Sequence, residues 1–529
     1  MDSLRPAGKL PNFDRLIKEG VSGPLRTLKP ILSPIIWTSI ATGKTPDKHG
    51  IFGFAEADTN RNIESISSKD RKVEALWNIL TEKGIRSGIV GWWATSPPEE
   101  INGVMVSDRI GFHSYGITVG KRKLVEYIYP PKKVAEFQPL LVLPKDISYQ
   151  ETEKFIHISQ SDFAKISKSY FDPKNRDNHF LHILAGMKMY ETMSNYILQK
   201  EHPDFMAVYF EAVDSLSHLF MPFAPPKREE VRNEEYEKYK NVITAIYQEQ
   251  DEAIGRLLKN VDKNTVVIIV SDHGFKTGAS RPTFTREIEG DTAVDSHRLF
   301  GVLVVSGPNI KKDIKISDAS VLDITPTILA ILQLPVGQDM DGKVLSEIFQ
   351  TAPKIKTIAS YESGAVRRFS EPERLAKKTD DEYVERLQAL GYISPNNSIA
   401  QPKSAEAAKS TQIELLNNQG LVEISKHNYQ QALRLFNQAL SLDSTYESTY
   451  NNLGSAFLSI GDPESVRNGE KAFRTALTLN PKNARVWSNL SLVLSRQNKY
   501  DEALIAGKKA LALNPNYAYA YNAVGTVHM

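Results

Sequence analysis

The first two thirds of the chain alternate short apolar runs with segments of helical period. The apolar runs end in Gly, Ser or Asp, and the helical segments place apolar residues three and four positions apart. That alternation is typical of an α/β domain whose parallel sheet is sandwiched by helices. The expected strands span residues 85–91, 205–210, 266–270 and 301–305, and a helix is expected at 73–83. The α/β domain is predicted to cover residues 1–350.

Two stretches interrupt this pattern. From about residue 110 to 178 the sequence is rich in Tyr, Lys and Pro, and we expect an insert there that caps the site. Residues 351–410 are polar and charged, with one helical stretch that stops at Gly391. They are predicted to form a connector with one helix.

The last part of the chain is periodic. Small residues recur 34, 37 and 34 positions apart, at Gly420, Gly454, Ser491 and Gly525. This period resembles the tetratricopeptide repeat, which implies an all-α solenoid over residues 411–529 with three full units and the first helix of an incomplete fourth. The three extra residues of the middle spacing are expected in the turn at 461–463. The resemblance also implies a protein or peptide partner.

One asparagine per repeat keeps the same period. Asn418, Asn452 and Asn489 each lie two residues before the small residue of their unit. They either line a peptide groove or hold the repeat backbone together, and the sequence leaves both open.

Composition limits the partners and the metal ligands that the chain can have. Lys and Arg number 65 against 63 Asp and Glu, so no excess of positive charge favours nucleic acid, and none is expected as a partner. Cysteine is absent, which leaves histidines and carboxylates as the strong metal ligands. The apolar runs are far shorter than the ~20 residues of a membrane-spanning helix, so no membrane span is expected. The compartment stays open.

Potential metal ligands lie next to three of the expected strands. Asp272 and His273 follow the strand at 266–270, Asp214 and His218 follow the strand at 205–210, and His297 precedes the strand at 301–305. Any one of them alone could cap a turn or lie on the surface. Because open α/β sheets bind ligands at the carboxyl ends of their strands, the five together indicate a metal site.

A hydroxyl is predicted near this site. Residues 32–43 read as a helix with Ser33 at the N-cap and Pro34 at the first helical position. Ser33 could be a cap alone, but the positive end of the helix also favours an oxyanion there. Trp37, one turn later, either faces the substrate or packs under the cap. His49 is expected to be structural.

These residues resemble the type I phosphodiesterase and nucleotide pyrophosphatase family of the alkaline phosphatase superfamily. The matching marks are Ser33 with its helix, the turn around His49, Asp214 with His218, Asp272 with His273, and His297. The resemblance implies an alkaline-phosphatase-like fold and two zinc ions. Asp214, His218 and His297 would hold one ion, Asp272 and His273 the other, and Ser33 would be the nucleophile. The implied activity is hydrolysis of a phosphodiester, pyrophosphate or phosphomonoester through a phosphoserine intermediate.

The chain departs from the family pattern in two places. The family's first-strand aspartate has no counterpart, because Asp2 has no apolar strand before it and no glycine after it. We therefore expect that the first strand is missing and that one zinc site is incomplete. The family's asparagine after the nucleophile is also absent, and Pro34 has no N–H to offer a phosphate oxygen.

A different class of function is compatible with these departures. The alternative is a catalytically impaired scaffold whose repeats bind a protein partner. A sulfatase of the same superfamily is disfavoured, because no basic residue follows Ser33 within the next four positions. The natural substrate is left open.

Overall fold

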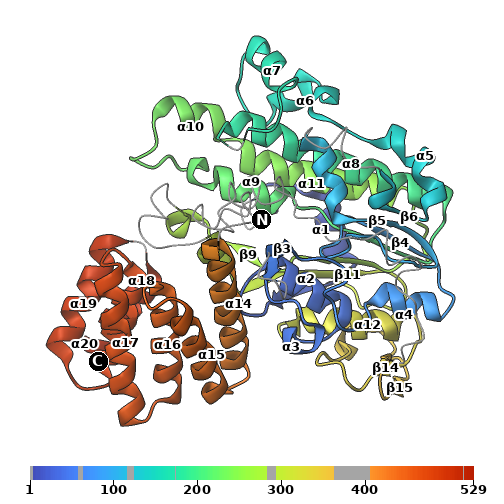
Figure 1. The fold of residues 1–529 in the computed structure, drawn as a ribbon. Coiled ribbons are helices and arrows are strands. Elements are labelled where there is room, and N and C mark those ends of the chain that lie inside the picture. The colour runs from blue at the N-terminus through green and yellow to red at the C-terminus, as the bar shows by residue number, and fades with distance from the viewer. Residues whose placement is uncertain are drawn as a thin grey trace. The chain divides into compact units, whose positions relative to one another are not determined.

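The computed structural model describes residues 4–57, 63–115, 124–172, 174–282, 293–362, 405–515 and 517–528. The chain forms two compact units. The first comprises Met1–Ile51, Ile66–Phe275 and Arg298–Leu390, and the second comprises Phe52–Ser65, Lys276–His297 and Gly391–Met529. Figure 1 shows the strands and helices of both. Each unit is described by itself below.

One sheet of the first unit is mainly parallel. Its strand order is β6-β5-β4-β7, in which β4 (Ser87–Val90) runs parallel to β5 (Gly103–Val106) and to β7 (Phe205–Val208). The edge strand β6 (Ile128–Tyr129) is antiparallel to β5. The parallel strands expected at 85–91 and 205–210 are confirmed, each shorter than predicted.

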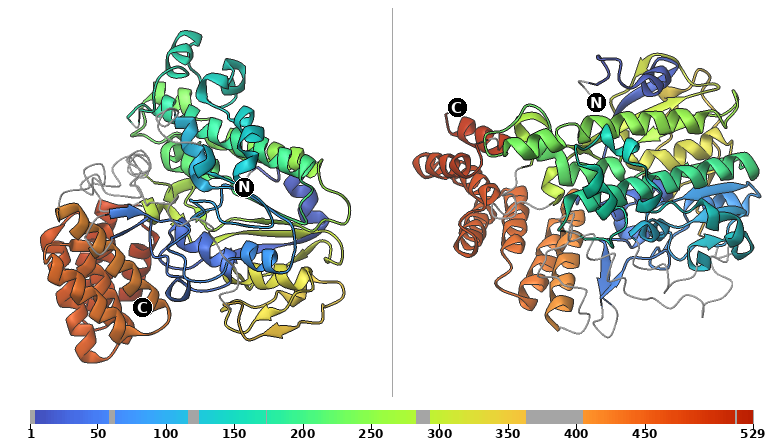
Figure 2. Two further views of the ribbon diagram at one scale, coloured as in Figure 1. Left: turned by 45° about the vertical axis from the view of Figure 1, so that its right-hand side comes forward. Right: turned by 90° about the horizontal axis from the view of Figure 1, so that it is seen from above.

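Helices cover both faces of this sheet. Val90, Val104 and Val106 pack in a cluster with Met189 and Met193 of α8 (Arg176–Lys200). On the opposite face, Ile89 and Met105 pack with residues of α2 (Ser33–Thr42) and α4 (Leu76–Glu82). Successive side chains of a strand point to opposite faces, so apolar residues at every position require cover on both sides. Figure 2 shows the helical layers from two further directions.

The second sheet of this unit is largely antiparallel. Its order is β12-β1-β11-β8, and β11 (Phe300–Ser306) is antiparallel to both β1 (Gly20–Arg26) and β8 (Val267–Val270). The strands expected at 266–270 and 301–305 are present, but their expected parallel pairing is wrong. Parallel neighbours need a crossover, usually a helix, and the described residues between β8 and β11 contain no α-helix.

The helices α1 (Pro11–Lys18) and α11 (Val242–Leu258) cover one side of this second sheet. Phe13 and Leu16 of α1 pack against Val304 of β11, together with Ile254 of α11. The Asp251 carboxylate accepts hydrogen bonds from the backbone N–H groups of Asn12 and Phe13 at the start of α1. The remaining elements of the first unit are α3 (Pro46–His49), α5 (Val134–Phe137), α6 (Tyr149–Glu153), α7 (Gln160–Ile166), α9 (Ala212–Phe220), α10 (Asn233–Tyr239), α12 (Ile324–Ile331), β9 (Gly274–Phe275), β12 (Ile314–Lys315), β13 (Ala319–Ser320), β14 (Val336–Gly337) and β15 (Thr357–Ile358).

The segment expected as an insert consists of short elements. Between β5 and α8 the described residues form brief helices and the single strand β6. Phe155 and Ile166 pack into the same core as Leu181, Leu216 and the other buried residues of α8, α9 and α11. The segment is therefore anchored on the helical layer, and its role as a cap stays a prediction.

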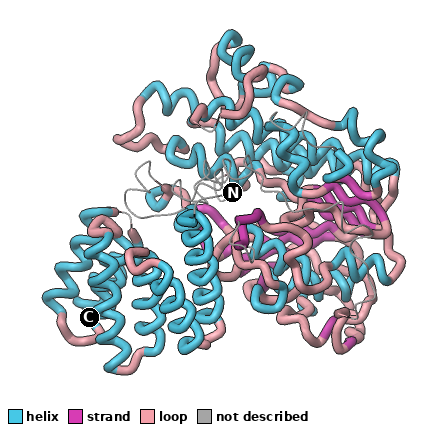
Figure 3. Tube along the Cα trace, viewed as in Figure 1, coloured by secondary structure: helices cyan, strands magenta, loops and turns pink. Residues whose placement is uncertain are grey.

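The second unit contains the predicted helical array. The described residues of this array, 405–515 and 517–528, form helices and loops only (Figure 3). Three helix pairs are followed by one further helix: α14 (Ala405–Ser425), α15 (Tyr429–Leu442), α16 (Glu447–Ile460), α17 (Pro463–Leu479), α18 (Ala484–Ser495), α19 (Tyr500–Leu513) and α20 (Ala518–His528). A Cβ on Gly420 would lie 2.3 Å from the Phe436 ring, and one on Gly454 would lie 2.7 Å from the Phe473 ring. The small residues therefore let paired helices touch, as the period predicts.

The three extra residues of the array lie in a helix. The second helix of the middle pair, α17, has 17 residues, whereas α15 and α19 have 14 each. The turn before α17 is only Gly461-Asp462, and the Asp462 carboxylate caps the helix by accepting N–H bonds from Glu464 and Ser465. The expectation that the turn absorbs the insertion is wrong, because this cap starts the helix directly after Gly461.

The repeated asparagines link neighbouring repeats. Asn452 donates to the Asn417 side chain, and Asn489 donates to the Asn451 side chain. Asn418 donates instead to the carbonyl of Phe52, which leads into the hairpin of β2 (Ala55–Ala57) and β3 (Ile63–Ser65) in the same unit. Asn452 and Asn489 thus hold repeats together.

Two further expectations concern the connector and the membrane. The helical stretch expected to end at Gly391 lies outside the described residues. Within the described parts of the chain, no helix is both long and apolar enough to cross a bilayer.

Candidate metal centre

Asp214 and His218 lie on one face of α9, which follows β7. The Asp214 Oδ1 atom is 3.5 Å from His218 Nε2, as the spacing of four residues predicts. The His218 side chain is buried, and its ring packs edge-on against Phe275, with 5.0 Å between ring centroids. The start of α9 therefore presents a carboxylate and an imidazole together.

Asp272 and His273 follow β8 and precede the short strand β9. Both are buried. His273 Nε2 lies 3.5 Å from Asp272 Oδ2 and 3.9 Å from Asp214 Oδ1. The ends of β7 and β8 thus bring their polar residues together, although the two strands belong to different sheets.

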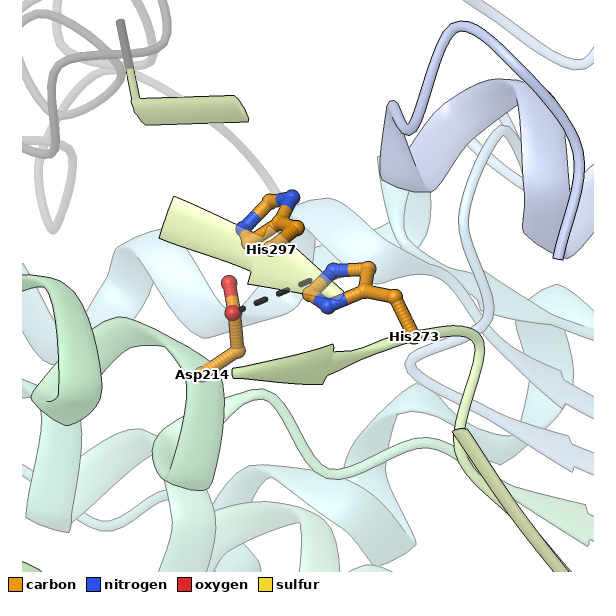
Figure 4. A group of neighbouring side chains, drawn as sticks. All are labelled: Asp214, His273 and His297. Atoms are coloured by element: carbon orange, nitrogen blue, oxygen red, sulfur yellow. Dashed lines mark ion pairs between the residues drawn. The ribbon is translucent and has the colours of Figure 1, made fainter. Parts of the chain in front are cut away.

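His297 completes a group of three. It begins β10 (His297–Arg298), the strand on which the chain re-enters the first unit, and β10 pairs with β9. Asp214, His273 and His297 each offer a ligand atom, and these atoms lie within 4.8 Å of one another. Figure 4 shows the Asp214 carboxylate directed at the His273 ring, beside His297. This group draws on both predicted ligand sets, so the division of the residues between two ions stays a prediction.

Ser33 lies near the candidate ligand Asp272. It is buried, and its side chain lowers the pKa of the Asp272 carboxyl. The helix α2 begins at Ser33 itself, with Leu32 as N-cap in an extended conformation and Pro34 as the second helical residue. The expected N-cap position is therefore wrong by one residue. No side chain caps the start of α2 by a hydrogen bond in the described structure.

The carboxylates of the group create an excess of negative charge in a buried place. Burial raises the pKa of Asp272, and the nearby Asp214 carboxylate raises it further, against the opposing effects of His273 and the Ser33 hydroxyl. Burial also raises the pKa of Tyr209 well above its usual value, and Asp272, Glu211 and Asp214 add to that shift. A bound cation would relieve this repulsion.

The donor set fits a divalent metal ion. Two carboxylates and three imidazoles are the nitrogen and oxygen ligands that zinc prefers in the absence of cysteine. The Oδ2 atom of Asp272 is buried and has no hydrogen-bond partner among the described residues. A buried carboxylate oxygen in that state costs free energy unless it is ligated. Asp2 lies outside the described residues, so the expected gap in the ligand set is left as a prediction.

Aromatic side chains surround the start of α2. The Trp37 ring meets those of Trp92 and Tyr209 edge-on, each with 4.9 Å between centroids, and Trp93 lies 6.2 Å from Tyr209. Trp92, Trp93 and Tyr209 are not among the site residues predicted from the sequence. A signal was present, because the parallel strands β4 and β7 end at one edge of their sheet and these residues follow directly.

His49 has the structural role expected of it. It is fully buried, its Nδ1 accepts the Ile51 N–H, and its Nε2 lies 2.9 Å from Ser39 Oγ. Burial lowers its pKa to about 3, and Arg71 adds to that effect. A neutral His49 thus ties its turn to α2.

Comparisons with known proteins match two parts of the chain. The profile of the family described as type I phosphodiesterase / nucleotide pyrophosphatase matches residues 1–356, and a tetratricopeptide-repeat profile matches residues 484–517. The chain is 23% identical over 257 residues to anaphase-promoting complex subunit 3 of Schizosaccharomyces pombe, which covers 48% of this chain and 35% of that protein. It is 26% identical over 145 residues to the human protein O-mannosyl-transferase TMTC3, which covers 27% of this chain and 15% of that protein. The chain thus spans about a third or less of the length of these curated relatives.

Solved structures of repeat domains are also similar to part of the chain. The Arabidopsis OM64 TPR domain has 19% sequence identity and a TM-score of 0.22, and covers 23% of this chain and 97% of that domain. The first TPR domain of the human RPAP3 protein has 19% identity and a TM-score of 0.21, with coverage of 22% and 90%.

Proposed function

The chain belongs, over residues 1–356, to the type I phosphodiesterase / nucleotide pyrophosphatase family, and from that premise we propose that it is a two-zinc phosphohydrolase with Ser33 as nucleophile. The observation that supports this proposal is the group of Asp214, His273 and His297, whose ligand atoms lie within 4.8 Å of one another, with buried Ser33 near enough to Asp272 to lower the pKa of that carboxyl. A hydroxyl next to a buried set of metal-ligating side chains is the arrangement that hydrolysis through a phosphoserine requires.

Five residues would hold the metal ions: Asp214, His218 and His297 for one, and Asp272 with His273 for the other. Zinc in these positions would neutralise charge on the phosphoryl group and lower the pKa of the Ser33 hydroxyl toward neutrality. Asp272 would also orient the Ser33 hydroxyl, whose side chain acts on the pKa of that carboxyl. Burial of both residues excludes competing water from the nucleophile.

The reaction itself has two steps. Ser33 Oγ attacks phosphorus, and the bond from phosphorus to the leaving alcohol or phosphate breaks as the new O–P bond forms. Water then cleaves the phosphoserine and regenerates Ser33. The substrate class is a phosphodiester, a pyrophosphate or a phosphomonoester, in keeping with the family.

A phosphate oxygen needs a hydrogen-bond donor that Pro34 cannot supply. Trp37 lies one helical turn after Ser33, on the same face of α2. Its Nε1 atom is buried and has no hydrogen-bond acceptor among the described residues. We assign this N–H to a phosphoryl oxygen of the substrate, which would satisfy the donor and stabilise the transition state.

The repeats are proposed to bind a protein partner, as tetratricopeptide arrays do. The alternative is a scaffold whose whole function is binding, and it predicts zinc binding without turnover of any ester. The deciding experiment loads the full chain with zinc and measures hydrolysis of bis-(p-nitrophenyl) phosphate, p-nitrophenyl phosphate, a pyrophosphate and p-nitrophenyl sulfate.

Turnover of a phosphate ester, with acid-stable label transferred from a 32P-labelled substrate to Ser33, supports the hydrolase. Stoichiometric zinc without turnover of any ester would favour the scaffold. Turnover of the sulfate ester alone would point to a sulfatase, the class of enzyme that the residues after Ser33 disfavour.

A further inference from the structure

Tyr209 is the first residue after β7, at the end of the parallel sheet. Its backbone N–H donates to the Val90 carbonyl at 3.0 Å, which continues the pairing of β7 with β4 by one residue. The residue is buried, with 7% of its surface exposed. Both its backbone and its ring are therefore held by the first unit, to which β4 and β7 belong.

Two tryptophan rings pack edge-on against the Tyr209 ring. The Trp37 ring lies 4.9 Å away between centroids at an interplanar angle of 73°, and the Trp93 ring lies 6.2 Å away at 66°. Trp37 belongs to α2, and Trp93 belongs to the loop after β4. Aromatic rings in edge-on contact have preferred relative orientations. Contacts from two separate elements thus restrict the directions in which the Tyr209 hydroxyl can point.

Trp37 connects this tyrosine to the candidate nucleophile. It lies one helical turn after Ser33, on the same face of α2. Its Nε1 atom is buried and has no hydrogen-bond acceptor among the described residues. A buried N–H without an acceptor costs free energy unless a ligand supplies one. The tyrosine therefore packs against a donor that the protein leaves for a ligand.

The Tyr209 hydroxyl also lies within the electrostatic reach of the candidate ligands. Burial raises the pKa of this phenol well above its usual value, and the carboxylates of Asp272, Glu211 and Asp214 raise it further. Ser33 acts on the pKa of the same Asp272 carboxyl. The phenol and the candidate nucleophile are thus both near Asp272. A phenol that keeps its proton can donate a hydrogen bond but cannot act as a base.

We infer that Tyr209 is a further catalytic residue, whose hydroxyl donates a hydrogen bond to a non-bridging oxygen of the phosphoryl group, beside the N–H of Trp37. These two side chains would replace the backbone N–H that Pro34 lacks. Donors that are already in place stabilise the negative charge that develops on oxygen in the transition state. All four residues belong to the first unit. This inference rests on the proposed function.

The test is Tyr209→Phe in the full, zinc-loaded chain, which keeps the ring and deletes the hydroxyl. It is measured with a series of substituted phenyl esters of the class that the wild type hydrolyses. The value of kcat/KM should fall about 10- to 100-fold, with the zinc content unchanged. Because the contact is to a non-bridging oxygen, the loss should be equal for leaving phenols of different pKa.

The matched control is Tyr361→Phe. Tyr361 is also a buried tyrosine of the first unit, and its hydroxyl donates to the Pro335 carbonyl at 2.6 Å. Its loss leaves that carbonyl without the bond, so the variant should have a lower melting temperature and the wild-type kcat/KM.

The possible outcomes separate this inference from the proposed function. A wild type that hydrolyses no phosphate ester contradicts the function itself. If the wild type is active and Tyr209→Phe keeps its kcat/KM, the role of Tyr209 is overturned and the function stands. A variant that loses zinc, or whose loss of rate grows with the pKa of the leaving phenol, also overturns the assigned contact.

Circular dichroism reports whether Tyr209→Phe is folded. If it is not, 3-fluorotyrosine at position 209 takes its place in the experiment. Its phenol is more acidic and therefore a stronger donor, so kcat/KM should rise, and an unchanged value would overturn the role of Tyr209.

Discussion

The Asp272 Oδ2 atom lies 3.5 Å from His273 Nε2 in the polar pair that follows β8. Ser33, the first residue of α2, lowers the pKa of the same carboxyl, so the candidate nucleophile lies beside a candidate ligand. Substitution of Ser33 and of the ligands should therefore have different effects.

Ser33→Ala should lower kcat by at least ~10³-fold, because the phosphoserine can no longer form. Zinc content should stay at the wild-type level, since a serine hydroxyl adds little affinity beside carboxylates and imidazoles. Turnover and metal analysis on the same preparation provide the measurement. Ser39→Ala is the matched control. It removes a buried hydroxyl of the same helix that contacts His49, and it should lower the melting temperature while turnover persists. If Ser33→Ala keeps most of the wild-type rate, Ser33 is not the nucleophile.

Asp272→Asn and His218→Ala should both lower bound zinc, because each removes a predicted ligand and leaves its neighbours misoriented. The measurement is metal content after dialysis against limiting zinc. Asp177→Asn serves as control, since it weakens an ion pair with Lys238 that contains no candidate ligand. If the His218 variant keeps the wild-type zinc content, His218 is not a ligand. If the Asp272 variant keeps it, Asp272 is not a ligand.

Trp37→Phe should lower kcat/KM by ~10- to 100-fold while zinc content is unchanged. The substitution keeps an aromatic ring and deletes the Nε1 donor, and hydrogen bonds to charged groups contribute about 1.5–3 kcal/mol. Trp77→Phe is the control, because the Trp77 Nε1 already donates to Glu99 Oε1 at 3.1 Å. That variant should lose stability and keep its turnover. Equal turnover of the Trp37 variant and the wild type would contradict the assigned contact.

The stability of the chain should depend on pH through Asp108. Burial raises the pKa of this carboxyl to about 6, from an ordinary 3.8, despite hydrogen bonds from the N–H groups of Ala94 and Arg109. Between pH 3.8 and about pH 6 the folded state therefore binds more protons than the unfolded state. The stabilisation of the folded state by protonated Asp108 is complete below pH 3.8 and is lost as the pH rises through about 6.

Asp108→Asn should flatten this part of the profile. The free energy of unfolding, measured by urea denaturation from pH 4 to 7, should fall less steeply with rising pH in the variant than in the wild type. Asp162→Asn, at an exposed carboxylate paired with Lys165, should leave the slope of that pH window as it is. Identical slopes for wild type and Asp108→Asn would show that the carboxyl titrates normally.

In the first unit, local patterns predicted four strands and two helices, and not the long-range pairing of all the strands. Apolar runs located β4, β7, β8 and β11, and the spacing of Asp214 and His218 placed both on one face of α9. The antiparallel pairing of β11 depends on how the chain returns from β9, which strand composition does not encode. The ring contact of Trp37 with Tyr209 joins residues far apart in sequence, and no local pattern indicates it. The repeats follow most directly from the sequence, because one period dictates every helix pair.

The repeat period also makes a prediction about packing, since equivalent glycines in it differ in their surroundings. A Cβ added to Gly454 would lie 2.7 Å from Cε1 of the fully buried Phe473, so the ring or the helix must shift. A Cβ added to Gly525, the equivalent position in α20, meets no atom within 4 Å among the described residues. Gly454→Ala should therefore destabilise the array by about 1–3 kcal/mol, as overpacking does. Gly525→Ala should be neutral or should stabilise α20 by up to ~1 kcal/mol, because alanine favours helix over glycine. Urea unfolding followed by far-ultraviolet circular dichroism measures both. Equal effects of the two substitutions would mean that helix propensity, and not contact with the ring, decides which residue the repeat accepts at this position.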